Sequence, residues 1–181
     1  MRVSKEKAAE NRARILTEAA RLFREHGLSG VGVDALTDAA GLTHGSLYSQ
    51  FGSKERLAAE ALSHAQTASS ARMSSARTLD DYATEYLSAD SRERRGDGCV
   101  IAALASEIPR QGAAIRHNFT DALRAVTREI TNLMPGRNKS EDKALAIAAT
   151  MVGALTLARA VDDPELSDRI LAAARTRLAS R

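Results

Sequence analysis

Short helices separated by glycines, in the segment between residues 33 and 57, limit most strongly what this chain can fold into. Two glycines, Gly41 and Gly52, are each followed closely by a hydroxyl residue, Thr43 or Ser53. A glycine ends a helix readily, and a hydroxyl side chain caps the next helix by accepting a backbone N–H. The segment therefore predicts helices at residues 33–39 and 44–51 and the start of a longer helix at Lys54.

Apolar residues recur at helical spacing through the rest of the chain, and no strand pattern or internal repeat is present. The composition agrees, because 44% of the 181 residues are hydrophobic, only three are proline and none is tryptophan. We expect an all-α protein of about nine helices, with a helix-turn-helix domain at 1–60 and a helical bundle at 61–181. The other predicted helices are 5–26, 54–75, 79–89, 99–108, 111–134, 140–160 and one that ends near 179.

Two short helices joined by a tight turn and braced by a longer one form a helix-turn-helix, whose second short helix enters the DNA major groove. Gly45 lets the backbone approach DNA closely, and Lys54 at a helix N-terminus favours a phosphate. The predicted inward residues are Leu42, Leu47 and Phe51. The outward polar residues suit phosphates and base edges; they are Thr43, His44, Ser46, Tyr48, Ser49 and Gln50. An alternative is that Tyr48 and Phe51 are both core residues.

The first fourteen residues carry five cations and two acids. A basic arm can follow DNA phosphates, and a solvated helix start has the same composition. The net charge of +3 does not separate these interpretations. The cations of this arm are Arg2, Lys5, Lys7, Arg12 and Arg14, of which Lys5 and Lys7 are candidate DNA contacts.

The segment from Gly32 to Leu57 resembles the DNA-binding domain of the tetracycline-repressor-like (TetR) family of bacterial transcriptional regulators. The family pattern is close to T-V-x-x-I-A-x-x-A-G-V-S-x-G-T-L-Y-x-Y-F-x-S-K-E-x-L. This chain reads G-V-D-A-L-T-D-A-A-G-L-T-H-G-S-L-Y-S-Q-F-G-S-K-E-R-L without a gap. The resemblance covers residues 10–60 well, and beyond them it extends only to the number and placement of helices. It implies a regulator, of which a repressor is the commoner kind.

The resemblance also implies roles for single residues. Tyr48 and Lys54 match phosphate-contacting positions of the family, and Thr43 matches the residue that caps the recognition helix and meets the DNA backbone. The positions at which the family reads bases are occupied here by His44, Gly45 and Ser46.

Two positions depart from the family pattern. Gly32 stands where the family has a Ser or Thr that caps the second helix and binds a phosphate, so that contact is missing here and affinity depends more on the basic arm. Gln50 replaces an aromatic residue. It either pairs with adenine or is simply exposed.

For the second half of the chain, the resemblance implies dimerisation by the last two helices and effector binding among the middle ones. Residues 145–160 are nearly all small or apolar, and 165–178 are amphipathic. Two such helices from each chain form a four-helix interface across a two-fold axis, which fits a pseudo-palindromic DNA operator. The alternative is a core within one chain.

A mainly apolar pocket would suit a hydrophobic or amphipathic small molecule. Each of its candidate lining residues is also a candidate for ordinary core. They are Met73, Tyr82, Tyr86, Ile101, Leu104, Ile108, Phe119, Leu123, Met151 and Leu155.

Cys99 is the single cysteine and lies at a predicted helix start, where the helix and nearby arginines would lower a thiol pKa. A thiol-based redox sensor is therefore an alternative. The segment G-C-V-I-A-A-L-A-S-E-I also looks like a variant common among these regulators, which indicates a packing role. The neighbouring run S-R-E-R-R, at residues 91–95, is predicted to be a solvated loop.

Other functions find little support in the sequence. The histidines at 26, 44, 64 and 117 are scattered, and no phosphate-binding glycine loop precedes a Lys-Ser or Lys-Thr pair. We therefore predict no catalytic residues, metal or cofactor. A helical adaptor that uses the helix-turn-helix for protein contacts is a further alternative. Because the chain lacks a run of eighteen apolar residues and an apolar signal core, we expect a cytoplasmic protein without a membrane partner.

Overall fold

The computed structural model describes residues 5–136 and 139–179, and this part of the chain is helical with no strand. The expected all-α fold is confirmed. Arg2 of the basic arm and Asn138, a possible helix cap, lie outside the described residues. The α-helices are α1 Lys5–His26, α2 Val33–Ala40, α3 His44–Phe51, α4 Lys54–Met73, α5 Leu79–Tyr86, α6 Ala89–Glu93, α7 Val100–Leu104, α8 Ala113–Leu133, α9 Glu141–Ala160 and α10 Pro164–Ala179.

The largest departure from the sequence expectation lies between residues 88 and 108. The predicted loop at 88–98 contains α6, whose N-cap Ser88 accepts the backbone N–H of Ser91 at 3.0 Å. Arg159 of α9 stabilises this short helix by donating to the carbonyl oxygen of Ser91 at 2.7 Å. The predicted helix at 99–108 is divided into α7 and a 3-10 turn, η1, at Ile108–Arg110. Pro109 lies in that turn and lacks the N–H that a continuous helix needs.

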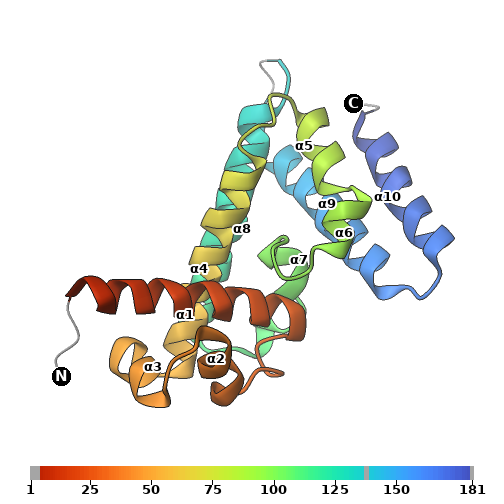
Figure 1. The fold of residues 1–181 in the computed structure, drawn as a ribbon. Helices are drawn as coiled ribbons and strands as arrows, with labels where there is room; N and C mark the ends of the chain where they lie inside the picture. The colour runs from red at the N-terminus through yellow and green to blue at the C-terminus, as the bar shows by residue number, and fades with distance from the viewer. Residues whose placement is uncertain (1–4, 137–138, 180–181) are drawn as a thin grey trace.

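The helices form two connected groups (Figure 1). In one group α1 packs on α2 and on α4, and α3 contacts both α2 and α4. In the other group α8 runs beside α4, and α9 packs against α8, α10 and α7. The helix α4 belongs to both groups, so the expected boundary between residues 60 and 61 falls inside a continuous helix. A movement of α4 therefore affects both groups.

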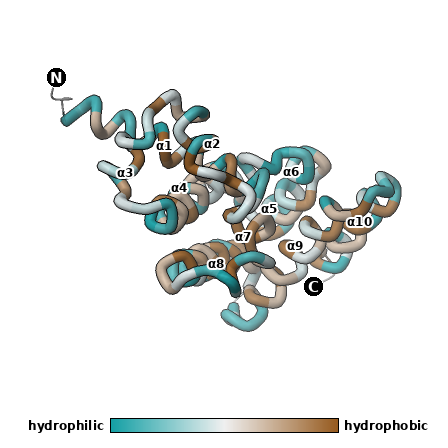
Figure 2. Tube along the Cα trace, turned by 90° about the horizontal axis from the view of Figure 1, so that it is seen from below, coloured by the Kyte–Doolittle hydropathy of each residue, from teal (hydrophilic) through white to brown (hydrophobic). Residues whose placement is uncertain are grey.

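Helix α9 is long and apolar enough to cross a membrane by length and composition, with a mean hydropathy of 1.4 over its most apolar window. Its position explains this composition without a membrane. The side chains of Ala144, Ile147, Met151 and Leu155 are buried against neighbouring helices. Figure 2 shows apolar segments concentrated where helices meet and hydrophilic segments toward the outside. One face of α9 thus belongs to the core, and 39% of its most apolar window is buried within the chain.

Candidate nucleic-acid interface and effector cleft

The recognition helix α3 is held by a cap at its start and by two buried side chains. Thr43 has extended backbone angles, and its hydroxyl accepts the backbone N–H of Ser46 at 3.3 Å. Leu47 and Phe51 are fully buried. Gly41 ends α2 with a φ of 61°, a left-handed conformation that strains other residues. These features fix the angle between α2 and α3.

The remaining side chains of α3 face solvent. Tyr48 is 48% exposed although it is aromatic. It is therefore not a core residue, whereas Phe51 is. His44, Gly45 and Ser49 are exposed, and Ser46 and Gln50 are half-buried. Lys54 lies partly exposed at the first position of α4. The structure thus gathers the sequence-predicted DNA contacts on α3 and the start of α4.

His44 has a charged neighbour that sequence reasoning missed. Its Nε2 lies 2.6 Å from Oδ1 of Asp34, which belongs to the first turn of α2. Both side chains are largely exposed. A surface pair of this kind contributes little to stability, but it places a carboxylate beside the start of the recognition helix. Gly32, the N-cap of α2, makes no side-chain cap bond.

Arg12 does not behave as a free cation of a basic arm. Its guanidinium lies 4.2 Å from the centre of the Phe51 ring, donates to the carbonyl oxygen of Gln50 at 2.9 Å and forms an ion pair with Glu60. Arg12 therefore has a structural role in addition to its place in the basic arm. The side chain joins α1, α3 and α4.

Other cations of the arm also have partners. Lys7 Nζ lies 3.0 Å from Glu10 Oε2, and Arg14 donates to Asn11 Oδ1 at 2.9 Å. Lys5 is exposed at the first described position. Partly paired cations give a weaker positive field than the sequence count suggests.

A cleft opens between α4, α5, α6, α8 and α9 and the loop that ends at Cys99. Four of the ten candidate effector residues line it: Met73, Tyr82, Tyr86 and Leu155. The other candidates lie outside its lining, Ile101 and Leu104 on α7, Ile108 in η1, Phe119 and Leu123 on α8, and Met151 on α9. The cleft holds about 540 Å³ when its opening to solvent is included, and about 40 Å³ is free space for water-sized molecules.

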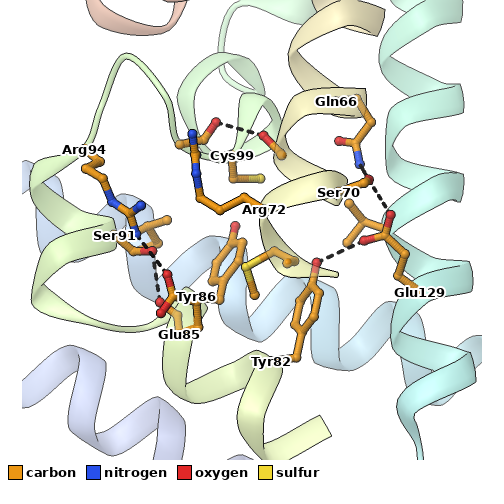
Figure 3. Close-up of a pocket in the computed structure, with 15 residues that line it drawn as sticks. Gln66, Ser70, Arg72, Tyr82, Glu85, Tyr86, Ser91, Arg94, Cys99 and Glu129 are labelled. Atoms are coloured by element: carbon orange, nitrogen blue, oxygen red, sulfur yellow. Dashed lines mark hydrogen bonds and ion pairs between the residues drawn. The ribbon is translucent and has the colours of Figure 1, made fainter. Parts of the chain in front are cut away.

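The walls of this cleft are more polar than the sequence predicted. Gln66 Nε2 donates to Ser70 Oγ at 3.0 Å, Ser70 donates to Glu129, and Tyr82 donates to Glu129 at 3.4 Å (Figure 3). The rings of Tyr82 and Tyr86 are stacked with centroids 6.3 Å apart. Sequence reasoning missed the polar residues because Gln66, Ser70 and Glu129 occupy ordinary helical positions on α4 and α8. Because each of these polar residues stands alone in its helical turn, the sequence does not indicate that they line one cleft.

Cys99 is half-buried in the same cleft, at the N-cap position of α7. The arginines expected to act on its thiol are held by acids elsewhere. Arg94 pairs with Glu85 at 2.9 Å, and Arg92 pairs with Asp168 at 2.7 Å. The side chain of Arg92 is only 19% exposed, so the prediction of a solvated loop at 91–95 is wrong for this residue. Its contact with α10 buries it.

The loop before Cys99 connects the two groups of helices. Arg24 of α1 donates to the carbonyl oxygen of Gly96 at 2.6 Å. From α4, Arg72 donates to the carbonyl oxygen of Asp97, and Ser69 donates to that of Gly98 at 3.3 Å. The end of α1, the end of α4 and the wall of the cleft thus meet at three consecutive residues.

A second connection joins η1 to the loop after α1. The carboxylate of Glu107 accepts the backbone N–H groups of Leu28 and Ser29 at 3.0 and 3.3 Å.

In the part of the chain that the structure describes, no group of three or more His, Cys, Asp or Glu residues is placed to hold a metal ion. The surfaces suited to binding another molecule are the exposed face of α3 and the cleft.

Comparison with known proteins places these observations in context. Residues 15–61 match the family model described as bacterial regulatory proteins, tetR family. A comparison with curated protein sequences found no match.

Solved structures similar to this chain span nearly its whole length. A TetR transcriptional regulator from Chloroflexus aurantiacus J-10-FL is 26% identical, with a TM-score of 0.76, and the match covers 97% of this chain and 95% of that one. A TetR-family regulator from Cytophaga hutchinsonii is 22% identical, with a TM-score of 0.76 and coverage of 99% and 98%. The reduced form of NemR from E. coli is 19% identical, with a TM-score of 0.78 and coverage of 93% and 94%.

Proposed function

We propose that the chain is a member of the TetR family of bacterial regulatory proteins, whose family model matches residues 15–61, and that it is a ligand-responsive repressor that binds a pseudo-palindromic operator as a dimer. The exposed Tyr48 on a recognition helix whose inner face is fully buried carries this proposal. A large aromatic side chain with a polar tip that faces solvent is suited to contact a nucleic acid. With Thr43 and Lys54 it provides the phosphate contacts, and His44, Gly45 and Ser46 face the bases.

A dimer through α9 and α10 fits the exposed apolar side chains. Leu145, Leu157 and Leu166 are large, apolar and exposed, and all three lie on these two helices. Apolar side chains gathered on one surface mark a protein interface. Two copies joined there form a four-helix interface and present two recognition helices, as half-sites about 34–36 Å apart require.

Release from the operator would follow from a change in the cleft. Helix α4 lines the cleft with Gln66, Ser70 and Met73, and its first residue is Lys54 at the DNA side. A ligand that shifts α4 or the loop at residues 96–98 alters the spacing of the two recognition helices in the dimer. An effector that binds more tightly to the dimer with the altered spacing increases the population of that dimer.

The test is selection of bound sequences from a random duplex pool with the purified protein. We expect an enriched inverted repeat and binding that weakens steeply with salt. Tyr48→Ala and Lys54→Ala should each weaken operator binding, and Lys54→Ala alone should also lower the salt slope, by about one for each recognition helix, because only the lysine is charged. Arg128→Ala, an exposed cation on α8, is the matched control and should change neither. No enrichment at low salt would instead favour a helical adaptor that contacts proteins.

A second candidate function is a redox-responsive regulator that acts through Cys99. The half-buried position of Cys99 in the cleft supports it, as does the similarity in fold to NemR, whose structure is described as a reduced form. Thiol labelling faster than that of free cysteine, together with operator release on oxidation, would favour this candidate. In both candidates the protein is a non-enzymatic, cytoplasmic DNA-binding protein.

A further inference from the structure

Two buried polar atoms in the cleft have no hydrogen-bond partner among the described residues. They are the amide oxygen of Gln66 and the hydroxyl of Tyr86, and each residue is only 7% exposed. Buried polar groups in folded proteins are nearly always hydrogen-bonded, so an unpaired one calls for an explanation. Two in one cleft, on the facing helices α4 and α5, indicate a missing partner. Figure 3 shows both groups facing the middle of the cleft.

The hydrogen bonds of the cleft fix which end of the Gln66 amide is unpaired. The carboxylate of Glu129 accepts from Ser70, so the Ser70 oxygen is free to accept in turn from Gln66 Nε2 at 3.0 Å. A flipped amide would place two acceptors against each other. The carbonyl end of Gln66 is therefore turned toward the cleft as an acceptor that requires a donor.

The Tyr86 hydroxyl provides the opposite group. Burial raises the pKa of Tyr86 well above its ordinary value, and Cys99 adds to this effect. The phenol is therefore neutral and remains a donor at physiological pH. Cys99 lies beside this hydroxyl, but its sulfur is only a weak acceptor, so an oxygen acceptor on a ligand would be a stronger partner for the phenol.

The charges around the cleft disfavour an ionised ligand. The carboxylate of Glu129 lines it and repels anions. Arg72 keeps its charge while it donates to the Asp97 carbonyl oxygen, and Arg94 pairs with Glu85, so two cations and two carboxylates balance among the lining residues. The remaining walls near the unpaired atoms include Met73, Val126 and Leu155, which suit a short hydrocarbon.

We propose that the cleft binds a small neutral molecule with a hydrogen-bond donor for Gln66 and an acceptor for Tyr86, such as a primary carboxamide on a short alkyl chain. This inference rests on the proposed function in taking the cleft as the effector site, and it replaces the mainly apolar effector expected from sequence. The free space of about 40 Å³ fits one to three water molecules. A molecule of six heavy atoms enters when Met73, which is unbranched and partly exposed, moves aside.

Three isosteric probes test the proposal: butyramide has the donor and the acceptor, 2-pentanone has only the acceptor, and butyrate is charged. Binding is followed by the methionine methyl signals of the full-length protein in NMR titrations. Met73 lines the cleft, and Met134 lies in a separate groove and serves as an internal reference. We expect saturable shifts of Met73 with butyramide and binding weaker by about tenfold for 2-pentanone and butyrate.

Two variants remove the unpaired atoms without leaving a new one. Tyr86→Phe and Gln66→Met should each weaken butyramide binding about tenfold. Tyr86→Phe should leave the melting temperature equal or higher, because the lost hydroxyl has no hydrogen-bond partner. Gln66→Met also removes the hydrogen bond from Nε2 to Ser70, so its melting temperature should fall by no more than the loss of one such bond explains. Equal shifts for all three probes, no shift of Met73, or unchanged binding by both variants would overturn the proposal.

Operator binding is measured on the same samples, which separates the two proposals. If the protein selects an operator and butyramide leaves Met73 unaffected, the cleft inference fails and the regulator stands. If butyramide binds as expected and no duplex is selected, the ligand site stands and the regulator fails. Release of the selected operator by butyramide, lost in Tyr86→Phe, supports both.

Discussion

At the scale of single residues, Arg12 decides how firmly the recognition helix is held. Its guanidinium covers the ring of Phe51, bonds to the end of α3 through the Gln50 carbonyl oxygen and pairs with Glu60 of α4. Both charged side chains are about two-thirds buried. The sequence counts Arg12 among the cations of a basic arm, because its partners lie thirty-eight and forty-eight positions away. Contacts between residues so far apart in the sequence cannot be predicted from a local sequence pattern.

We expect Arg12→Ala to lower the free energy of unfolding by about 1–3 kcal/mol, since it removes a cation–π contact, an ion pair and packing over Phe51. Operator affinity should fall as well, because α3 loses a contact at its end. Urea unfolding and operator titration measure the two effects. Arg14→Ala, two positions along α1 with an exposed side chain, is the control and should change stability by less than about 0.5 kcal/mol. Equal effects of the two variants would remove the structural role of Arg12.

The buried tyrosines of the cleft predict a loss of stability in alkali. Burial raises the pKa of both Tyr82 and Tyr86, and the negative charge of Glu129 raises that of Tyr82 further. The folded protein therefore keeps both phenols protonated while the unfolded chain loses these protons above about pH 10. This stabilisation is complete below that pH and is lost as the pH rises further.

Each tyrosine should lower the free energy of unfolding by up to about 1.4 kcal/mol per pH unit above about pH 10. Urea unfolding of the wild type and Tyr86→Phe between about pH 9 and about pH 11.5 measures the difference. The variant lacks one ionising phenol, so its stability should fall less steeply. Parallel curves for the two proteins would show that Tyr86 ionises equally well in the folded state.

At the scale of helices, the caps and glycines of the helix-turn-helix could be predicted because they are local. Thr43 accepts from Ser46 and Ser53 from Arg56, each three positions away. Ser140 likewise caps α9. The ends of the helices from α6 to η1 could not be predicted in this way. They depend on Arg159 of α9, which donates to carbonyl oxygens more than sixty positions away. Tertiary hydrogen bonds there override the local propensity.

The cap of the recognition helix gives a prediction at this scale. Thr43→Ala removes the acceptor for the Ser46 N–H and should destabilise the protein by about 0.5–2 kcal/mol. Operator affinity should fall, both through fraying of α3 and through loss of a phosphate contact. Thr43→Ser keeps the acceptor and is the matched control. If thermal unfolding of the alanine and serine variants coincides, the cap contributes no measurable stability.

At the scale of the whole molecule, the cleft and the recognition helix share few elements. Helix α4 passes from one to the other, and the loop at residues 96–98 touches α1, α4 and the cleft. Family resemblance predicted the regulator, and helical periodicity predicted the bundle. The polar character of the cleft could not be predicted, because it arises where Gln66 of α4, Tyr86 of α5 and Glu129 of α8 converge. Only the packing of the helices reveals that convergence.

The last prediction concerns the dimer and the apolar surface of α9. Leu157 is 58% exposed, so Leu157→Glu leaves the packing within one chain intact. In a dimer through α9 and α10, the new carboxylates would be buried without partners, at a large cost. We therefore expect a folded monomer, measured by sedimentation velocity, with an unchanged helical circular dichroism spectrum. Operator affinity should fall by at least about tenfold, because one recognition helix then binds alone.

Thr67→Glu provides the matched control, since Thr67 is exposed on α4, away from α9 and α10. It introduces the same charge and should leave both the dimer and operator binding unchanged at moderate salt. A dimer that survives Leu157→Glu would place the interface on another surface. The exposed leucines of α9 and α10 would then need a different partner, since an apolar side chain this exposed gains nothing from contact with water.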